Sequence, residues 1–490
     1  MTNYKKLFLL SFTIICSVQM IQSDYIAAVV EYEPINATFP NETVEANLAQ
    51  YVYFIEHAQL SSVQIIVFPE YGLTGLADNA SEYAIEIPNP TDNSIHFEHF
   101  WLEKLSNAAV AHSMYVVVNL LEKEKAEKNI LYYNTDVVFD TKGRIVAKHR
   151  KVNLFQEPLL TPGNSEQNKN IFTTDFGVTF GVFTCADISF YNPAKTILSN
   201  PAVTDIIFPT AWGSFLPFFH SLSIQNAYTL ASKVNLLAAN LNSVENGMSG
   251  SGIYAADGTI ISYYLSGKPG SKMQIATVKT TPTSETTVFD TYGYEPLNNT
   301  ISTLDNLNTN RYFDSEKYVF KRLNISQLNI KEEVCHRSFC CAFSINVSST
   351  ALNASEIYQI MAYRGPARIG ELRNLKFCSL VACKSSDLNT CGDRNIKLTS
   401  KLESVLVETN VLDEREGFYL PISLTGDLVP VFNTSYNSTA YKGARIYKYL
   451  ASNIKQENIL AFGIVANDGI TLSFNSMLIV GILVLKHLLR

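Results

Sequence analysis

Along the first 280 residues, short apolar runs alternate with stretches in which apolar residues recur three and four positions apart. Residues 25–32, 63–68 and 114–121 are runs of mostly apolar residues, which predicts buried strands. The spacing within 44–60 and 99–113 predicts two amphipathic helices. Because strands alternate with helices, we expect an α/β layered core of mostly buried strands.

The pattern continues with a hairpin and then changes. Residues 133–151, YNTDVVFDTKGRIVAKHRK, contain two β-runs joined by a turn signal, and further strand-like runs follow up to NLLAANL. After the polar stretch TTPTSETT, short β-runs such as VLVETN, GFYLPISL and ILAFGIVAN follow one another with little helical pattern. We therefore expect an α/β domain over 24–300 and a second, β-rich domain over 310–466.

Both ends of the chain resemble processing signals. Residues 1–23 combine two lysines, an apolar core and small polar residues, which predicts a secretory signal peptide, with a membrane anchor as the alternative. Residues 467–490 combine small residues, a polar spacer and an apolar run, the arrangement of a glycolipid (GPI) anchor signal. Lys486 and His487 interrupt that run, so a poor transmembrane span and plain secretion are the alternatives.

Glycosylation signals agree with export. The Asn-x-Ser/Thr triplets begin at Asn36, Asn41, Asn79, Asn298, Asn324, Asn346, Asn353, Asn433 and Asn437. Together with the signal peptide they predict an extracellular glycoprotein, GPI-anchored at the cell surface or secreted.

The cysteines separate into one cluster and one isolated residue. The clustered cysteines are Cys335, Cys340, Cys341, Cys378, Cys383 and Cys391. In an oxidising compartment six clustered cysteines predict three disulfides, with fifteen connectivities open, and a zinc site is disfavoured by context and spacing. Cys16 leaves with the signal peptide, so Cys185 is the odd cysteine: a reactive thiol or a small buried hydrophobe.

Composition excludes several classes of partner. With 47% hydrophobic and 17% charged residues the 490-residue chain is globular, and its net charge of −7 argues against nucleic acid. His96 and His99 are three positions apart and His112 lies further along the chain, which could suggest a metal site. The suggestion is weak, because no obvious third or fourth ligand completes the pair. We expect no metal and no cofactor, since no cofactor motif is present, and we expect Trp212 to line a pocket or pack at a strand end.

Three polar residues each follow an apolar run that predicts a strand. Glu70 follows Val67–Phe68–Pro69, Lys151 ends the hairpin, and Cys185 ends GVFTC. In α/β layers reactive groups gather at the carboxyl ends of strands, so we expect one shared site. A carboxylate can take the proton of a thiol, and an ammonium beside it favours the thiolate and the oxyanion formed when sulfur attacks an amide.

The same residues carry a resemblance to a known family. FPEYGLTG, HRKVNLF and GVFTCADISF resemble the catalytic motifs of the nitrilase superfamily of carbon–nitrogen hydrolases. RKVNLF, FTCADI, DIIFPTAW, VNLLAANLN and GSGIYAADG are similar to its vanin and biotinidase branch. The resemblance implies an α-β-β-α sandwich with a disulfide-containing C-terminal domain, and an amidase acting on a small-molecule substrate.

The resemblance also implies a role for each matched position. Glu70 would be the general base and later acid, Lys151 would stabilise the tetrahedral intermediate, and Cys185 would form a thioester. The N–H of Ala186 would be a second oxyanion donor, and Glu157 would position the lysine and water.

Two departures from the pattern bear on the substrate. Pantetheine-cleaving members often have phenylalanine at the position of Ala186 and a histidine-containing helix at 223–228. We expect hydrolysis of pantetheine to pantothenate and cysteamine. The alternatives are hydrolysis of biotin amides, and a non-catalytic adhesion or ligand-binding glycoprotein on the same fold. The chain is expected to be a monomer or a homodimer.

Overall fold

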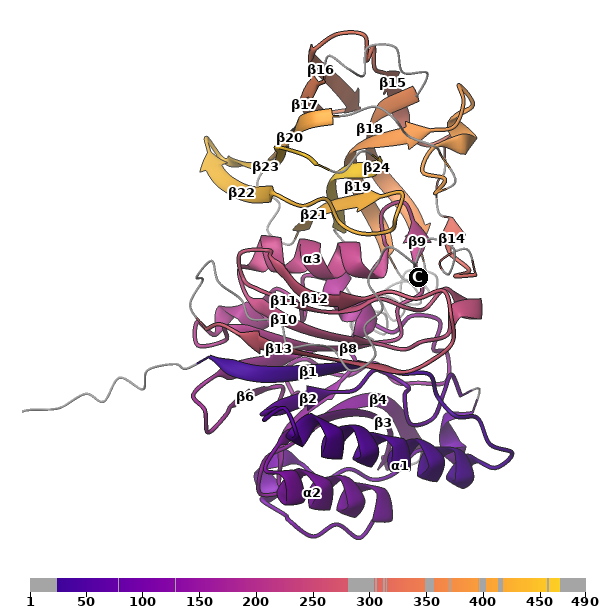
Figure 1. Ribbon diagram of the computed structural model, residues 1–490, viewed down its shortest axis with the longest axis vertical. Coiled ribbons are helices and arrows are strands. Elements are labelled where there is room, and N and C mark those ends of the chain that lie inside the picture. The colour runs from indigo at the N-terminus through magenta and orange to yellow at the C-terminus, as the bar shows by residue number, and fades with distance from the viewer. Residues whose placement is uncertain are drawn as a thin grey trace, which may run out of the picture.

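The computed structural model describes residues 24–467, except 78, 128, 281–303, 305, 312, 314, 349–356, 370–371, 395, 397–401, 413–416 and 456–457 (Figure 1). The expected signal peptide, the C-terminal anchor signal, most of the polar linker, Asn298 and Asn353 lie outside the described residues. No helix within the described ranges is long and apolar enough to cross a membrane.

The first sheet has six strands. In spatial order they are β13 (Lys272–Val278), β1 (Tyr25–Glu31), β2 (Ile65–Val67), β3 (Tyr115–Lys125), β4 (Ile130–Phe139) and β5 (Ile145–Arg150). Helices α1 (Pro40–Gln59) and α2 (Phe100–His112) pack on its outer face, where they share one apolar cluster with the sheet. The helices predicted from apolar spacing are therefore confirmed, and α1 begins four residues earlier than expected because Pro40 suits a first helical turn.

The second sheet also has six strands. Their spatial order is β12 (Ile260–Tyr264), β11 (Ser251–Tyr254), β10 (Asn235–Asn240), β8 (Asp205–Thr210), β7 (Thr179–Val182) and β6 (Ile171–Thr173). An apolar core lies between the two sheets, with Val29 and Val67 of the first sheet on one side and Ile207 of the second sheet on the other. Helix α3 (Ser221–Ser232) covers the outer face of this sheet, which completes the expected α-β-β-α sandwich.

The C-terminal domain is β-rich, as predicted, and its strands form a β-sandwich. One sheet orders β15 (Val319–Arg322), β18 (Ile357–Ile369), β19 (Leu372–Cys383), β24 (Ile459–Asn467) and β21 (Phe418–Thr425). The other orders β16 (Asn329–His336), β17 (Phe339–Val347), β20 (Leu402–Leu412), β23 (Ala444–Ser452) and β22 (Thr434–Tyr441). Apolar residues of both sheets form a single core between them.

Helix α3 lies between the second sheet and the C-terminal strands (Figure 1). The ring of Tyr228 on α3 packs edge-on against Phe418 of β21, with centroids 5.9 Å apart. Phe218, just before the helix, packs on Phe377 of β19 at 4.8 Å. The two domains therefore share one apolar interface.

Short elements complete the chain. The 3₁₀ helices are η1 (Ala80–Glu82), η2 (Pro90–Asp92), η3 (Cys185–Ser189), η4 (Thr196–Ser199), η5 (Val244–Asn246) and η8 (Leu388–Thr390). A two-stranded parallel ribbon pairs β9 (Phe215–Leu216) with β14 (Asn310–Arg311), so a segment leading into the C-terminal domain joins the catalytic domain.

Strand direction sets the place of the site. In the first sheet β1, β2 and β3 are parallel, and β5 runs the same way because two antiparallel pairings separate it from β3. In the second sheet β7, β8 and β10 are parallel. The residues that follow β2, β5, β7 and β8 therefore lie at the carboxyl ends of these strands, where reactive groups gather in α/β layers.

Candidate active site

Glu70, Lys151 and Cys185 meet in one buried place. Glu70 comes shortly after β2 and Lys151 directly after β5, whereas Cys185 opens η3 after β7. Lys151 Nζ lies 2.7 Å from Glu70 Oε1, and Cys185 lines the same cavity as these two residues. The three residues are 1%, 2% and 6% exposed. Two members thus come from the first sheet and the third from the sheet packed on it.

Glu157 is the second carboxylate on the lysine. Its Oε2 lies 2.7 Å from Lys151 Nζ and accepts the backbone N–H of Phe155 at 2.9 Å. The ammonium is therefore held between two carboxylates rather than beside one, which fixes its position.

Two further side chains complete this arrangement, and the sequence analysis missed both. Asn134 on β4 donates from Nδ2 to Glu70 at 2.7 Å and to Glu157 at 2.8 Å. The Tyr71 hydroxyl donates a short hydrogen bond to Glu157. A signal for Asn134 was present, because Asn134, Thr135 and Asp136 form a polar run inside an otherwise apolar strand.

A second buried network lies directly behind the nucleophile. The Thr184 hydroxyl donates to Asp136 Oδ2 at 2.5 Å, and Asn119 donates to the other oxygen of Asp136 at 2.8 Å. Asp187, within η3, lies 2.8 Å from His149 Nε2 and accepts the backbone N–H of Asn153 at 2.8 Å. These bonds flank Cys185 on both sides and fix its short helix to the first sheet.

The backbone is strained around the site. Cys185 has φ +45°, Tyr71 has φ +59° and Gln156 has φ +56°. Each is a non-glycine residue in the left-handed region, and each lies at or next to a member of the group just described. Strain of this kind persists where the surrounding structure enforces it, and it gathers at functional sites.

The resting site favours a neutral thiol. Burial and then the Glu70 carboxylate raise the pKa of Cys185 well above its usual value, and Lys151 offsets only part of this shift. The expectation that the ammonium favours thiolate is right in direction, but burial of the thiol and then the charge of Glu70 outweigh the effect of Lys151 on the pKa of Cys185. A thiolate therefore forms only as the proton moves to a base.

The two carboxylates differ in their proton affinity. Burial raises the pKa of Glu70, and Lys151 only partly opposes it. Burial also acts on Glu157, but Lys151 and the hydrogen bonds from Lys151 and Tyr71 outweigh it and lower the pKa of Glu157. Glu70 is thus suited to exchange a proton, whereas Glu157 stays charged and holds the ammonium.

A cavity of about 590 Å³ opens onto these residues. Ala186 and Trp212 line it, and Trp212 is fixed by an Nε1–H bond to the Phe219 carbonyl at 2.8 Å. Its apolar wall is formed by Leu76, Ala77, Ala80, Leu121, Phe155, Pro158, Leu159, Leu160, Phe190, Ala211, Phe215, Phe219 and Met248. Among the described residues that line it, the charged ones are Glu70, Lys151 and Glu157.

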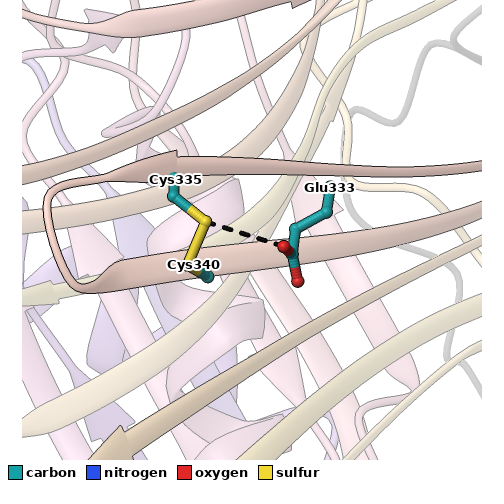
Figure 2. Close-up of side chains that lie close together, drawn as sticks. All are labelled: Glu333, Cys335 and Cys340. Atoms are coloured by element: carbon teal, nitrogen blue, oxygen red, sulfur yellow. Dashed lines mark hydrogen bonds between the residues drawn. A yellow bond between two sulfur atoms is a disulfide. The ribbon is translucent and has the colours of Figure 1, made fainter.

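The three histidines considered as metal ligands are engaged separately. His96 lies 3.7 Å from Glu103, His99 accepts the backbone N–H of Trp101, and His112 contacts Gln59. In the described ranges one other group, Glu333 with Cys335 and Cys340, has the spacing of a metal site (Figure 2). Those sulfurs are bonded to each other, so they are not thiolate ligands.

The clustered cysteines form three disulfides. Cys335 pairs with Cys340 across a hairpin, Cys341 with Cys378 between the two sheets, and Cys383 with Cys391. Cys185 is the free, buried cysteine of the described chain.

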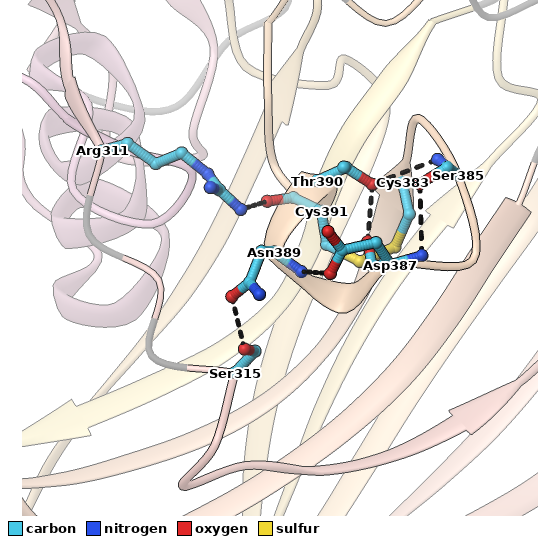
Figure 3. Close-up of a disulfide and its surroundings, with 8 residues drawn as sticks. All are labelled: Arg311, Ser315, Cys383, Ser385, Asp387, Asn389, Thr390 and Cys391. Carbon is cyan, nitrogen blue, oxygen red and sulfur yellow. Dashed lines mark hydrogen bonds between the residues drawn. A yellow bond between two sulfur atoms is a disulfide. The ribbon is translucent and has the colours of Figure 1, made fainter.

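The last of these disulfides closes a loop at the domain junction (Figure 3). The Cys391 carbonyl accepts a 2.6 Å bond from Arg311 of β14, the strand paired with Phe215 of the cavity wall. The loop therefore supports one wall of the cavity.

The sequence and fold can now be compared with known proteins. The family model described as carbon-nitrogen hydrolase matches residues 26–280, and the model of the vanin C-terminal domain matches residues 307–469. The chain belongs to the carbon–nitrogen hydrolase family. It is a hydrolase of carbon–nitrogen bonds in non-peptide amides.

Relatives of this hydrolase resemble it over most of their length. Pantetheinase of Bos taurus is 32% identical, over 75% of this chain and 76% of its own. Pantetheinase of Homo sapiens is 31% identical over 78% of each chain, and vanin-like protein 2 of Drosophila melanogaster is 29% identical over 90% and 89%. The crystal structure of Nit3 of Saccharomyces cerevisiae, a nitrilase superfamily member, matches with TM-score 0.44 and 20% identity, over 53% of this chain and 91% of its own.

Proposed function

We propose that this hydrolase cleaves pantetheine to pantothenate and cysteamine through a thioester on Cys185. The observation that carries the proposal is that Cys185 lines the same buried cavity as Glu70 and Lys151, whose side chains lie 2.7 Å apart. The relatives named pantetheinase, near 30% identity over most of the chain, support this choice of substrate.

Acylation begins with a proton transfer. The thiol proton passes from Sγ to Glu70, and the sulfur attacks the amide carbonyl carbon. The negative charge that develops on the carbonyl oxygen is met by the Lys151 ammonium and the Ala186 N–H. The C–N bond then breaks, Glu70 returns its proton to the departing amine, and the acyl group remains on Cys185 as a thioester.

Deacylation follows the same steps with water as the nucleophile. Glu70, now a carboxylate, takes a proton from a water molecule whose oxygen attacks the thioester carbonyl. The same two donors stabilise the second tetrahedral intermediate. Its collapse releases the carboxylic acid and the sulfur, which regains the proton from Glu70. Glu157 remains charged throughout and keeps the ammonium in place.

The cavity favours pantetheine over a biotin amide of lysine. The charged groups on its described lining are already bound to one another. A pantothenoyl group and a cysteamine amide carry no formal charge, whereas the amino-acid part of biotinyl-lysine carries an ammonium and a carboxylate that would need partners. The largely apolar wall suits the neutral substrate.

A direct test is to trap the acyl-enzyme. We expect the purified full chain to release cysteamine from pantetheine faster than lysine from biotinyl-lysine. Rapid acid quenching followed by mass spectrometry should find a pantothenoyl group on the peptide containing Cys185. Cys185→Ala should lack both signals while melting normally. A folded wild-type protein with neither release nor adduct would instead indicate the non-catalytic module.

We further propose that the chain is exported, N-glycosylated and attached to the cell surface by a glycolipid. Three disulfides fit an oxidising compartment. The described sequon residues are all exposed: Asn36, Asn41, Asn79, Asn324, Asn346, Asn433 and Asn437. Enzymatic removal of N-glycans should lower the apparent mass, and a phospholipase specific for the anchor should release the protein from cells. Retention after that treatment would contradict the anchor.

A further inference from the structure

The hydroxyl of Ser189 is buried at the cavity without a partner. Ser189 is 4% exposed and lines the same cavity as Cys185. Its Oγ has no hydrogen-bond partner among the described residues, although its backbone carbonyl accepts a 3.4 Å bond from Asn467. The residue is thus fixed through its backbone while its side-chain hydroxyl is left unpaired.

An unpaired buried hydroxyl is costly. Leaving such a group unsatisfied destabilises the folded protein, and most buried polar side chains in proteins have a partner. The neighbouring cavity wall offers no hydrogen-bonding side chain here, because Phe190 directly follows Ser189 and Ala186, three residues before it, is also apolar. A group that enters the cavity is the remaining source of a partner.

The position of Ser189 separates it from the reacting atoms. It is the last residue of η3, the 3₁₀ helix that Cys185 begins. A rise of about 2 Å per residue puts Ser189 about 8 Å along the helix axis from Cys185. A substrate group that meets Ser189 would therefore lie several bonds away from the carbonyl carbon, and Ser189 is not a catalytic group.

We propose that Ser189 is a specificity-determining residue whose hydroxyl hydrogen-bonds to a hydroxyl or amide group on the acyl part of the substrate. The inference rests on the proposed function. In pantetheine the two hydroxyls and the second amide all lie on the acyl side, whereas the leaving group carries only a thiol. Ser189 thus selects hydroxylated or amide-bearing acyl chains over hydrocarbon chains.

The test compares two substrates with the same leaving group. One is pantetheine, and the other is a cysteamine amide of a hydrocarbon acid of similar length. We expect Ser189→Ala to lower the ratio of kcat/KM for pantetheine over the hydrocarbon amide by about 3- to 10-fold, the effect of one net hydrogen bond. Ser189→Thr, which keeps a hydroxyl, should retain more of the ratio.

A matched control is available on α3. Ser223 is also buried with an unpartnered hydroxyl, but it does not line the cavity. Ser223→Ala should leave the substrate ratio unchanged. An equal loss on both substrates in Ser189→Ala would show a structural role and overturn the proposal, as would no change on either.

Failure of the proposed function gives a different result. If the wild type cleaves neither amide, the proposal that the protein hydrolyses pantetheine is wrong. The role of Ser189 is then tested by measuring pantetheine binding alone. Calorimetry would compare pantetheine binding to Cys185→Ala with binding to the variant that also carries Ser189→Ala. Weaker binding to the double variant supports Ser189 as a reader of the acyl chain, and equal or absent binding overturns it.

Discussion

The side-chain amide of Asn134 donates to Oε1 of Glu70 over 2.7 Å. The same nitrogen reaches Glu157 at 2.8 Å, so one neutral group from β4 ties together the two carboxylates on either side of Lys151. A hydrogen bond to the charged form of an acid favours that form. Asn134 therefore holds Glu70 in the state that accepts a proton.

We predict that Asn134→Ala moves the acidic limb of the kcat/KM profile to higher pH. Loss of this donor raises the pKa of Glu70 further, so a larger fraction is protonated and inactive as base at neutral pH. A hydrogen bond to a charged group is worth about 1.5–3 kcal/mol, which corresponds to about one to two pH units. A pH–rate profile for amide cleavage measures the shift.

The control for this prediction lies on the same strand. Thr135 donates to Glu122 at 2.8 Å and touches neither site carboxylate. Thr135→Val should lose some stability and leave the acidic limb in place. Matching profiles for Asn134→Ala and the wild type would show that Asn134 does not act on Glu70.

Replacement of Lys151 by methionine should lower kcat by at least about 10²-fold, the effect of losing one oxyanion donor. The two carboxylates then face each other without a cation, which raises the pKa of Glu70 and shifts the acidic limb upward as well. Steady-state kinetics from pH 5 to 9 separates the two effects. Lys142→Met, at an exposed lysine, is the control, and a change confined to KM would contradict the role of Lys151.

Asp136 should make the protein less stable as pH rises towards 7. Burial raises the pKa of Asp136 to about 7, so between its unfolded value near 4 and pH 7 the folded chain holds a proton that the unfolded chain has released. Stability contributed by this proton is present at low pH and lost as pH rises through that range. Asp136→Asn should therefore show a smaller fall of Tm between pH 4 and 8 in thermal melts.

Some pH dependence should survive in that variant. Burial also raises the pKa of Glu31 to about 7, and its contribution has the same sign. Identical slopes of Tm against pH in the wild type and Asp136→Asn would refute the assignment to Asp136.

Arg311→Met should raise KM about 5- to 10-fold with a smaller effect on kcat. The variant loses the 2.6 Å bond to the Cys391 carbonyl, which holds the disulfide loop against β14 and so supports Phe215 in the cavity wall (Figure 3). Ser315→Ala removes an exposed bond to Asn389 from the same segment and should change neither constant. A pure kcat effect in Arg311→Met would point to a different role.

The sequence predicted the elements of the fold better than their arrangement. Apolar runs and helical spacing are local signals, so most central strands of the first domain, α1, α2 and the hairpin of β4 and β5 were foreseen, whereas β6, β11, β12 and β13 were not. The order of strands in each sheet and the pairing of Cys341 with Cys378 depend on contacts distant in the chain, for which one sequence carries no local signal.

The same distinction holds at the site. Glu70, Lys151 and Cys185 were found because each follows an apolar run. Tyr71 is 86 residues from its partner Glu157, and Asn134 is 64 residues from Glu70, so neither bond had a local pattern. The effect of Lys151 on the thiol was expected in the right direction, but the larger effect of burial was not foreseen. Spacing along the chain does not reveal that Lys151 is shared between two carboxylates.

Helix α3 has a different neighbour on each side. Its inner face covers the second sheet, and the ring of Tyr228 packs both on Phe183 of the first domain and on Phe418 of β21. A chain that ends before residue 304 would leave Phe218 and Tyr228 without their aromatic partners in the C-terminal domain. We expect this truncated protein to aggregate during expression. Each domain covers apolar surface of the other, so substitutions at this interface in one domain have to fit the side chains of the other.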